Sequence, residues 1–391
     1  MSRRWWVLVG AVAVQVSIGG VYAWSVMARA LADPRAMGLS GVEAAVPFEV
    51  AIGLIVVGAF VGGRWQDRRG PRVVALVGVT VYAAGVLVSS LATSRADLWI
   101  LVVGYGVLGG FGLGLAYIVP IAMLQKWFPD KAALVTGLAV GGFGFGAVLT
   151  SPLAQALIGR DPTRPTAAFV VLGLVYLALG VSGAATFANP PTSRSEVASE
   201  GMTMRQALST RDWYLLTATL AASVFAGISL ISVASSSMVD IAGLTPVAAA
   251  AAVGALGLFN GAGRIVWAWA SDRLGKTRTL ALILVCQGVS LVALPHATSA
   301  AVFLVLAAVI YTCYGGTFGV LPSTAGRFFG LRHVGAIYGL MLIGWSVGGV
   351  VGPLVIAVLH GSQGWTTAYT IVGAIAVVAA VLPLAARPRP T

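Results

Sequence analysis

Charged residues are scarce in this sequence, and cysteine and histidine are scarcer still. Only 9% of the 391 residues are charged, whereas an average soluble globular protein carries about 25%. The two cysteines, Cys286 and Cys313, lie inside apolar segments without the spacing of a metal or redox site, so we interpret them as packing residues. The scarcity of charge excludes an ordinary soluble domain.

The residues that catalysis needs are also lacking. His296, His333 and His360 are far apart in the sequence, with no carboxylate pair or metal-binding cluster beside them. The glycine-rich runs lie inside apolar segments and do not follow strands, so they do not form phosphate-binding loops. We therefore predict that the chain is not an enzyme and that it has no cofactor and no bound metal.

A net charge of +12 would suggest a nucleic-acid partner in a soluble protein. Here the basic residues fall in short loops, and no basic patch is interleaved with aromatic residues. This pattern excludes a nucleic-acid partner.

Long apolar runs are present from end to end. Hydrophobic residues make up 58% of the chain, and 50 glycines accompany them, as is typical of membrane helices that pack through small residues. The pattern predicts an all-α integral membrane protein in the lipid bilayer. Twelve segments are long enough to span it, near 5–28, 44–63, 73–92, 98–125, 132–158, 166–188, 213–239, 246–270, 278–295, 299–325, 334–359 and 365–386.

The longest polar interruption divides these segments into six and six. It begins with two prolines and runs from Asn189 to Asp212. We predict an N-terminal six-helix half over 1–188, a cytoplasmic linker over 189–212 and a C-terminal half over 213–391.

Basic residues indicate the orientation of the chain. If the N-terminus is cytoplasmic, eighteen of the 24 basic residues lie on the cytoplasmic side and five on the outer side, with Arg264 inside a span. By the positive-inside rule, both termini are cytoplasmic. We predict a multi-pass protein of the plasma (cytoplasmic) membrane, which is the inner membrane in a cell with two.

The two halves share a loop motif. "GRWQDRRGPR" follows the second segment and "AWASDRLGKTR" follows the eighth, and both contain D-R-x-G, with Asp67 and Asp272 205 positions apart. Duplicated six-helix halves predict a substrate site near the bilayer midplane, opened alternately to each side.

These loops resemble the signature loop of the major facilitator superfamily, and the resemblance spans the chain. It implies a major facilitator fold of twelve transmembrane helices in two pseudo-symmetric halves. It also implies that the aspartates pair with helix ends across a cytoplasmic gate, with gating residues Asp67, Arg68, Gly70, Asp272, Arg273 and Gly275. The second copy departs from the pattern, because Ala268 stands where the loop usually begins with glycine. Alternatively, the arginines are only topology anchors.

Arg264 is the ionisable residue placed well inside a span. It lies eight residues before Asp272, which is about 12 Å from the cytoplasmic end of its helix at 1.5 Å per residue. An arginine at mid-membrane costs at least roughly 2.5–3.5 kcal/mol. Its helix contains no acidic residue to offset that cost, and among the others only Glu49 falls within a span. Either the side chain snorkels to the interface or it faces a central cavity and binds an anion.

A carboxylate substrate suits the second alternative, because guanidinium binds carboxylate bidentately. Asn260 precedes Arg264 by four residues, so the two side chains share a helix face. Asn260 either donates a hydrogen bond to the same anion or bonds to another helix. Aromatic residues in other segments are candidate lining residues, with packing as the alternative for each: Tyr22, Tyr117, Tyr311, Tyr314 and Trp345.

Further motifs narrow the resemblance. "GRIVWAWASDRLG", "VYAWSV", "KWFPDKAALVTGL", "YGLMLIGWSVGGVVGP" and "MTMRQALSTRDWYLL" resemble the oxalate/formate antiporter family, which is related to monocarboxylate transporters of lactate and pyruvate. The resemblance implies that Arg264 is the residue that anchors the carboxylate. It also implies that Tyr117 occupies the position of the family's tyrosine in the fourth helix. Oxalate-transporting members also have a lysine in the eleventh helix, where this chain has Trp345.

One cation matches one carboxylate, so we favour a small monocarboxylate such as lactate, pyruvate, glycolate or formate over a dianion. We predict a monomeric secondary transporter that co-transports a proton by alternating access. Monocarboxylate relatives often carry an aspartate one turn before the arginine, but Asn260 cannot titrate. The substrate carboxylate, Glu49 or Asp240 would then take part, with Glu49 the better placed. The alternatives are exchange for a counter-anion and a non-transporting sensor on the same fold.

Overall fold

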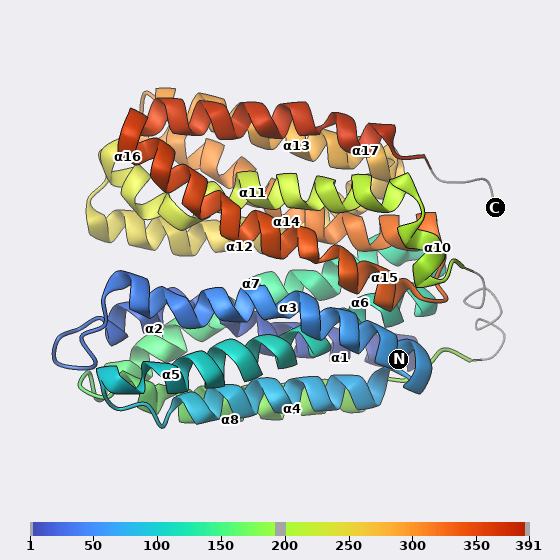
Figure 1. The fold of residues 1–391 in the computed structure, drawn as a ribbon, viewed down its shortest axis with the longest axis horizontal. Coiled ribbons are helices and arrows are strands. Elements are labelled where there is room, and N and C mark those ends of the chain that lie inside the picture. Colours follow the sequence, from blue (N-terminus) through green and yellow to red (C-terminus); the bar gives the residue numbers. More distant parts are fainter. Residues whose placement is uncertain (1–2, 192–200, 388–391) are drawn as a thin grey trace. The chain divides into compact units, whose positions relative to one another are not determined.

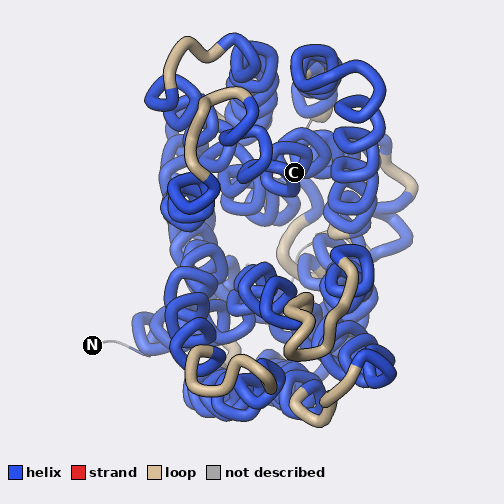
Figure 2. The backbone as a smooth tube through the Cα atoms, turned by 90° about the vertical axis from the view of Figure 1, so that its left-hand side faces the viewer, coloured by secondary structure: helices blue, strands red, loops and turns tan. Residues whose placement is uncertain are grey.

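The structure, a computed structural model, describes residues 3–191 and 201–387. Within these ranges the regular elements are all helices (Figure 1), joined by short loops (Figure 2). Part of the predicted linker, 192–200, and Arg389 of the predicted cytoplasmic side lie outside the described residues.

The described part of the first half contains eight α-helices and a π-helical stretch. The 3-10 turn η1 (Gly20–Ala23) joins the first two helices, and η3 (Val102–Gly109) continues α5 into α6. The α-helices are α1 (Arg3–Gly19), α2 (Trp24–Leu31), α3 (Gly41–Arg69), α4 (Pro71–Ser89), α5 (Leu98–Leu101), α6 (Gly110–Trp127), α7 (Ala132–Ile158) and α8 (Ala168–Ala185).

A short helix within the predicted linker precedes the first span of the second half. The Thr203 side chain caps this helix by accepting from the backbone N–H of Gln206. The helices are α10 (Met204–Leu208), α11 (Arg211–Asp240), α12 (Pro246–Leu274), α13 (Lys276–Ala293), α14 (Ala300–Phe329), α15 (Val334–Met341), α16 (Ile343–Ala379) and α17 (Val381–Ala385).

Eleven stretches of the described chain are long and apolar enough to cross a membrane, and the last is a double crossing. It runs from Val334 to Ala385, 52 residues, whereas one crossing needs about 20. Inside it Gly364 has φ 78° and ψ 175°, which breaks the helix. A positive φ of this kind suits glycine, because it has no Cβ. The chain thus has the twelve predicted spans.

The described chain forms two compact units. One comprises 1–130, 142–201 and 331–340, and the other comprises 131–141, 202–330 and 341–391. Each unit therefore contains most of one half and a short segment at the start of the fifth span of the other half. The domain boundaries at 188 and 213 stay a prediction.

The same pattern of helix packing occurs within each of the two units. In the first, α3 packs on α6, and in the second α12 packs on α14. A Cβ on Gly58 would collide with the backbone oxygen of Phe111, and a Cβ on Gly263 would collide with that of Thr312. Gly263 follows Gly58 by 205 positions and Thr312 follows Phe111 by 201, so glycine permits the same close helix contact twice.

Candidate functional site

Arg264 is fully buried in α12. The helix begins after Thr245, whose side chain accepts a hydrogen bond from the backbone N–H of Ala248. Side chains on a helix lean toward its N-terminus, and Arg264 follows that rule: its Nε donates to Oδ1 of Asn260 at 3.4 Å. Its Nη1 donates to the backbone oxygen of Val140 at 3.3 Å. Arg264 is 0% exposed, so its guanidinium does not snorkel to water.

An aromatic cluster lies beside this guanidinium. Cζ of Arg264 is 5.0 Å from the ring centroid of Phe318, within the range of a cation–π contact. Phe318 meets Tyr314 at 5.4 Å and Trp345 at 4.9 Å, both edge to face. The structure thus brings Tyr314 and Trp345, two predicted lining residues, to the ring that contacts Arg264.

Small residues in α14 allow these groups to approach. A Cβ on Gly315 would collide with the backbone oxygen of Asn260, and a Cβ on Gly319 would collide with that of Arg264. The side-chain Oδ1 of Asn260 would lie 2.7 Å from the same Cβ of Gly315. Asn260, at 8% exposed, therefore has its carboxamide pressed against α14 and bonded to Arg264.

A second aromatic cluster lies in the other unit. The ring of Phe143 meets Tyr22 and Tyr117 edge to face, each at 5.2 Å. Tyr117 is 0% exposed, and its backbone oxygen accepts a hydrogen bond from Nε2 of Gln15 at 3.2 Å. Two predicted lining residues of the first half, Tyr22 and Tyr117, thus share one phenylalanine.

The two clusters correspond in register. Phe318 follows Tyr117 by 201 positions and Trp345 follows Phe143 by 202. The edge-to-face angles agree, at 69° for the later pair and 70° for the earlier.

The position of Arg264 has a counterpart as well, and that counterpart is alanine. A Cβ on Gly339 would lie 2.5 Å from the backbone oxygen of Ala59, and a Cβ on Gly137 would lie 2.7 Å from that of Arg264. Arg264 follows Ala59 by 205 positions, so the cation is present in one half of the repeat only.

Two other predicted residues lie elsewhere. Tyr311 is buried in an apolar cluster with Leu256 and Tyr369, and the described contacts do not place it beside Phe318. Glu49 lies in α3 with an exposed side chain, and the described residues offer it no hydrogen bond or ion pair.

Asp67, at the end of α3, contacts two elements. Its Oδ1 lies 3.3 Å from Nζ of Lys126, and its Oδ2 accepts a hydrogen bond from the backbone N–H of Ala336 at 3.3 Å. Ala336 is the third residue of α15, so its N–H is one of those that the helix itself leaves without a partner, at the positive end of the helix dipole. Only 3% of the Asp67 side chain is exposed.

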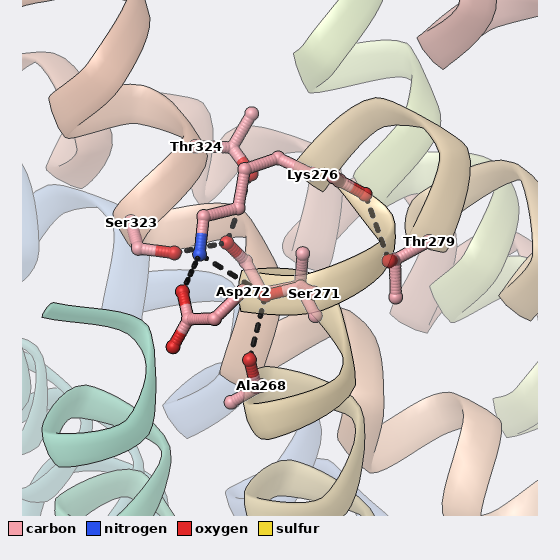
Figure 3. A network of polar contacts seen from close by, with 9 residues as sticks. Ala268, Ser271, Asp272, Lys276, Thr279, Ser323 and Thr324 are labelled. Atoms are coloured by element: carbon pink, nitrogen blue, oxygen red, sulfur yellow. Dashed lines mark hydrogen bonds and ion pairs between the residues drawn. The ribbon is translucent and has the colours of Figure 1, made fainter. Parts of the chain in front are cut away.

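Asp272 has a different partner, from its own loop. Its Oδ1 lies 2.6 Å from Nζ of Lys276, and 41% of its side chain is exposed. Lys276 also donates to Oγ of Ser271 at 3.1 Å. Figure 3 shows the lysine amine between these groups and the side of α14 that carries Ser323. The described contacts of Asp272 include no helix N-terminus.

Of the other predicted gating residues, the two glycines have the same backbone role and the two arginines lie at the surface. Gly70 and Gly275 have φ values of 85° and 89°, and each backbone N–H closes the preceding helix. Arg68 and Arg273 are exposed, and the guanidinium of Arg273 stacks on the ring of Trp269, with Cζ 4.0 Å from the ring centroid.

Sequence reasoning missed four contributors: Phe143, Phe318, Lys126 and Lys276. The signal for the two phenylalanines was available, because each aligns with a predicted aromatic residue once the halves are shifted by 201 or 202 positions. Among the described residues, no group of three metal-ligating side chains is close enough to hold a metal ion.

Known proteins resemble the chain along its length. It matches the family described as Major Facilitator Superfamily over residues 4–342 and again over 218–391. The oxalate:formate antiporter of Oxalobacter formigenes is 26% identical, with 100% of this chain and 93% of that protein covered. Rat monocarboxylate transporter 13 is 28% identical, with 87% and 81% covered.

The fold resembles a solved structure. The Escherichia coli fucose:proton symporter matches with a TM-score of 0.75 over 98% of each chain, at 14% sequence identity. This likeness concerns the fold alone.

Proposed function

Because this chain belongs to the Major Facilitator Superfamily, whose members are transporters and not enzymes, we propose that it is a secondary transporter of a small monocarboxylate. The buried Arg264 carries this proposal. A guanidinium that is 0% exposed in a membrane-spanning helix costs free energy, which a functional role explains. It binds the substrate carboxylate, and the amide of Asn260 adds a hydrogen bond to the same anion or keeps Arg264 in place.

The number of cations favours a monocarboxylate. Arg264 is the one charged residue of the described chain that is buried over its whole surface. Trp345, at the position where oxalate-transporting relatives are expected to have lysine, is 1% exposed and packs on Phe318. A dianion would leave one charge poorly compensated in a site of low dielectric constant. The substrate is therefore of the lactate, pyruvate, glycolate or formate type, and its proposed lining residues are Tyr22, Tyr117, Tyr311, Tyr314 and Trp345.

The transport cycle follows from the repeat. The two halves rock about the substrate, and Asp67 together with Ala336 and Lys126 closes the cytoplasmic gate. Both termini are cytoplasmic, the protein acts as a monomer in the plasma membrane, and the halves are 1–188 and 213–391.

Coupling to a proton is the leading form of this proposal. Asn260 cannot titrate, so the proton enters with the substrate carboxylate or through Glu49. The second candidate is exchange of the substrate for a counter-anion, the mode of transport that the name of one relative, the oxalate:formate antiporter, gives for that protein.

Counterflow in proteoliposomes tests the proposal. Purified protein is reconstituted, and uptake of labelled lactate and formate is measured with and without an inward proton gradient and with and without internal acid. Uptake driven by the gradient alone supports symport, and uptake that needs internal anion supports exchange. If no carboxylic acid moves under either condition, the proposed function is wrong.

A further inference from the structure

Phe318 is the group in this site with no assigned role. It lies in α14, 0% exposed, and its ring is 5.0 Å from Cζ of Arg264. Arg264 donates hydrogen bonds from Nε at 3.4 Å and from Nη1 at 3.3 Å, and both are longer than the usual range of roughly 2.7–3.2 Å. Long hydrogen bonds restrict the plane of a guanidinium less than short ones.

We propose that Phe318 is a positioning residue for Arg264: the face of its ring fixes the guanidinium plane in which the carboxylate is bound. This inference rests on the proposed function. Both groups are buried, so water does not screen the attraction between the cation and the ring quadrupole. An Arg264 that is oriented before the substrate arrives loses less entropy when it binds.

The residues packed around Phe318 restrict the orientation of its ring. Tyr314 and Trp345 contact it edge to face at 5.4 and 4.9 Å. The glycine contacts of α14 with α12, at Gly315 and Gly319, set the distance between the helices. A ring clamped by its neighbours can in turn orient the guanidinium.

The aromatic pair occurs in both halves of the repeat, whereas the arginine occurs in one. Tyr117 and Phe143 form the same edge-to-face pair in the other unit, where Ala59 occupies the position of Arg264. The aromatic pair therefore forms in a half that has no arginine at the position of Arg264.

A fluorination series at position 318 tests the inference. Phenylalanine is replaced by its mono-, di- and trifluorinated forms, which keep the shape of the ring and progressively weaken the negative charge on its face. The matched control is the same series at Phe303, which is also 0% exposed and lies in the apolar cluster with Leu256 and Tyr369. L-lactate exchange is measured in proteoliposomes, with formate as a second probe.

We expect the KM for lactate to rise stepwise to about three- to tenfold with the trifluorinated ring at 318, at unchanged maximal rate. The series at Phe303 should leave KM unchanged. Phe318→Leu should raise KM by about tenfold, and Phe318→Tyr, which keeps the ring, should recover most of the affinity.

A flat KM across the series at 318 in protein that exchanges lactate or formate overturns the role of Phe318 and leaves the proposed function standing. Wild-type protein that moves neither acid overturns the proposed function itself.

Discussion

The two D-R-x-G loops have nearly the same backbone and different partners. Gly70 and Gly275 both adopt a positive φ, of 85° and 89°, and both let one helix end where the next begins. Asp67 nevertheless bonds to Lys126 and to the start of α15, whereas Asp272 bonds to Lys276 in its own loop. A repeated motif thus preserves a turn without preserving its contacts.

One sequence difference accompanies the different partners of the two aspartates. Pro71 follows Gly70 in the first loop, and Lys276 follows Gly275 in the second. Both residues begin a helix, a position that proline suits because the N–H there is not needed. Proline brings no charge to the first loop, whereas Lys276 neutralises Asp272 from four residues along the chain, across the break that Gly275 makes between α12 and α13.

The largest effect in this comparison is expected from Asp67→Asn. The change removes one partner of an ion pair in which the side chains of Asp67 and Lys126 are only 3% and 16% exposed, and breaking such a pair is costly. We expect transport turnover to fall by about tenfold or more, measured as the maximal rate of lactate exchange.

Asp272→Asn is the matched change in the second loop. Because 41% of the Asp272 side chain is exposed, the pair contributes little, and turnover should stay within about twofold of wild type. Equal losses in both variants would show that the loops act alike despite their different partners.

Trp345→Lys changes the aromatic cluster beside Arg264. It places a lysine where the oxalate-transporting relatives are expected to have one. A second cation near Arg264 should improve recognition of a dianion, so the ratio of oxalate to lactate affinity should rise by about tenfold. Affinities come from competition against labelled lactate. Because Trp345 packs on Phe318, lactate affinity should also fall slightly. An unchanged ratio would contradict the argument from charge number.

Lys276→Pro gives the second loop the residue of the first and should have a moderate effect. The freed Asp272 can then bind the start of α7 as Asp67 binds that of α15, and we expect turnover to slow by about two- to fivefold. The readout is the maximal exchange rate, alone and in the Asp272→Asn background. If the change acts equally in both backgrounds, Asp272 does not mediate it.

Hydropathy alone could predict the number of spans but not their full length. The second segment was predicted over 44–63, whereas α3 continues to Arg69. Its last turn carries charged residues, which hydropathy excludes from a span although the helix continues into water. The boundary between the last two spans was predicted correctly, because Gly364 interrupts an apolar run that is too long for one crossing.

Residues on one helix face were also predictable. The spacing of Asn260 and Arg264 requires that they share a face, and the structure joins them through Nε and Oδ1. The contact of Arg264 with Phe318 was not predictable from spacing, because it depends on the rotation of two helices that close glycine contacts determine. Lys276 was given no role of its own in the second loop, and only coordinates show that it binds Asp272.

The central claim is that Arg264 binds the carboxylate, and equilibrium binding tests it most directly. Binding of labelled lactate and formate to purified protein in detergent is measured for wild type, Arg264→Gln and Arg278→Gln, the last being an exposed arginine on the neighbouring helix α13. The account predicts that Arg264→Gln remains folded and monodisperse but binds neither acid, while Arg278→Gln binds as wild type does. Unchanged affinity in folded Arg264→Gln protein would contradict it.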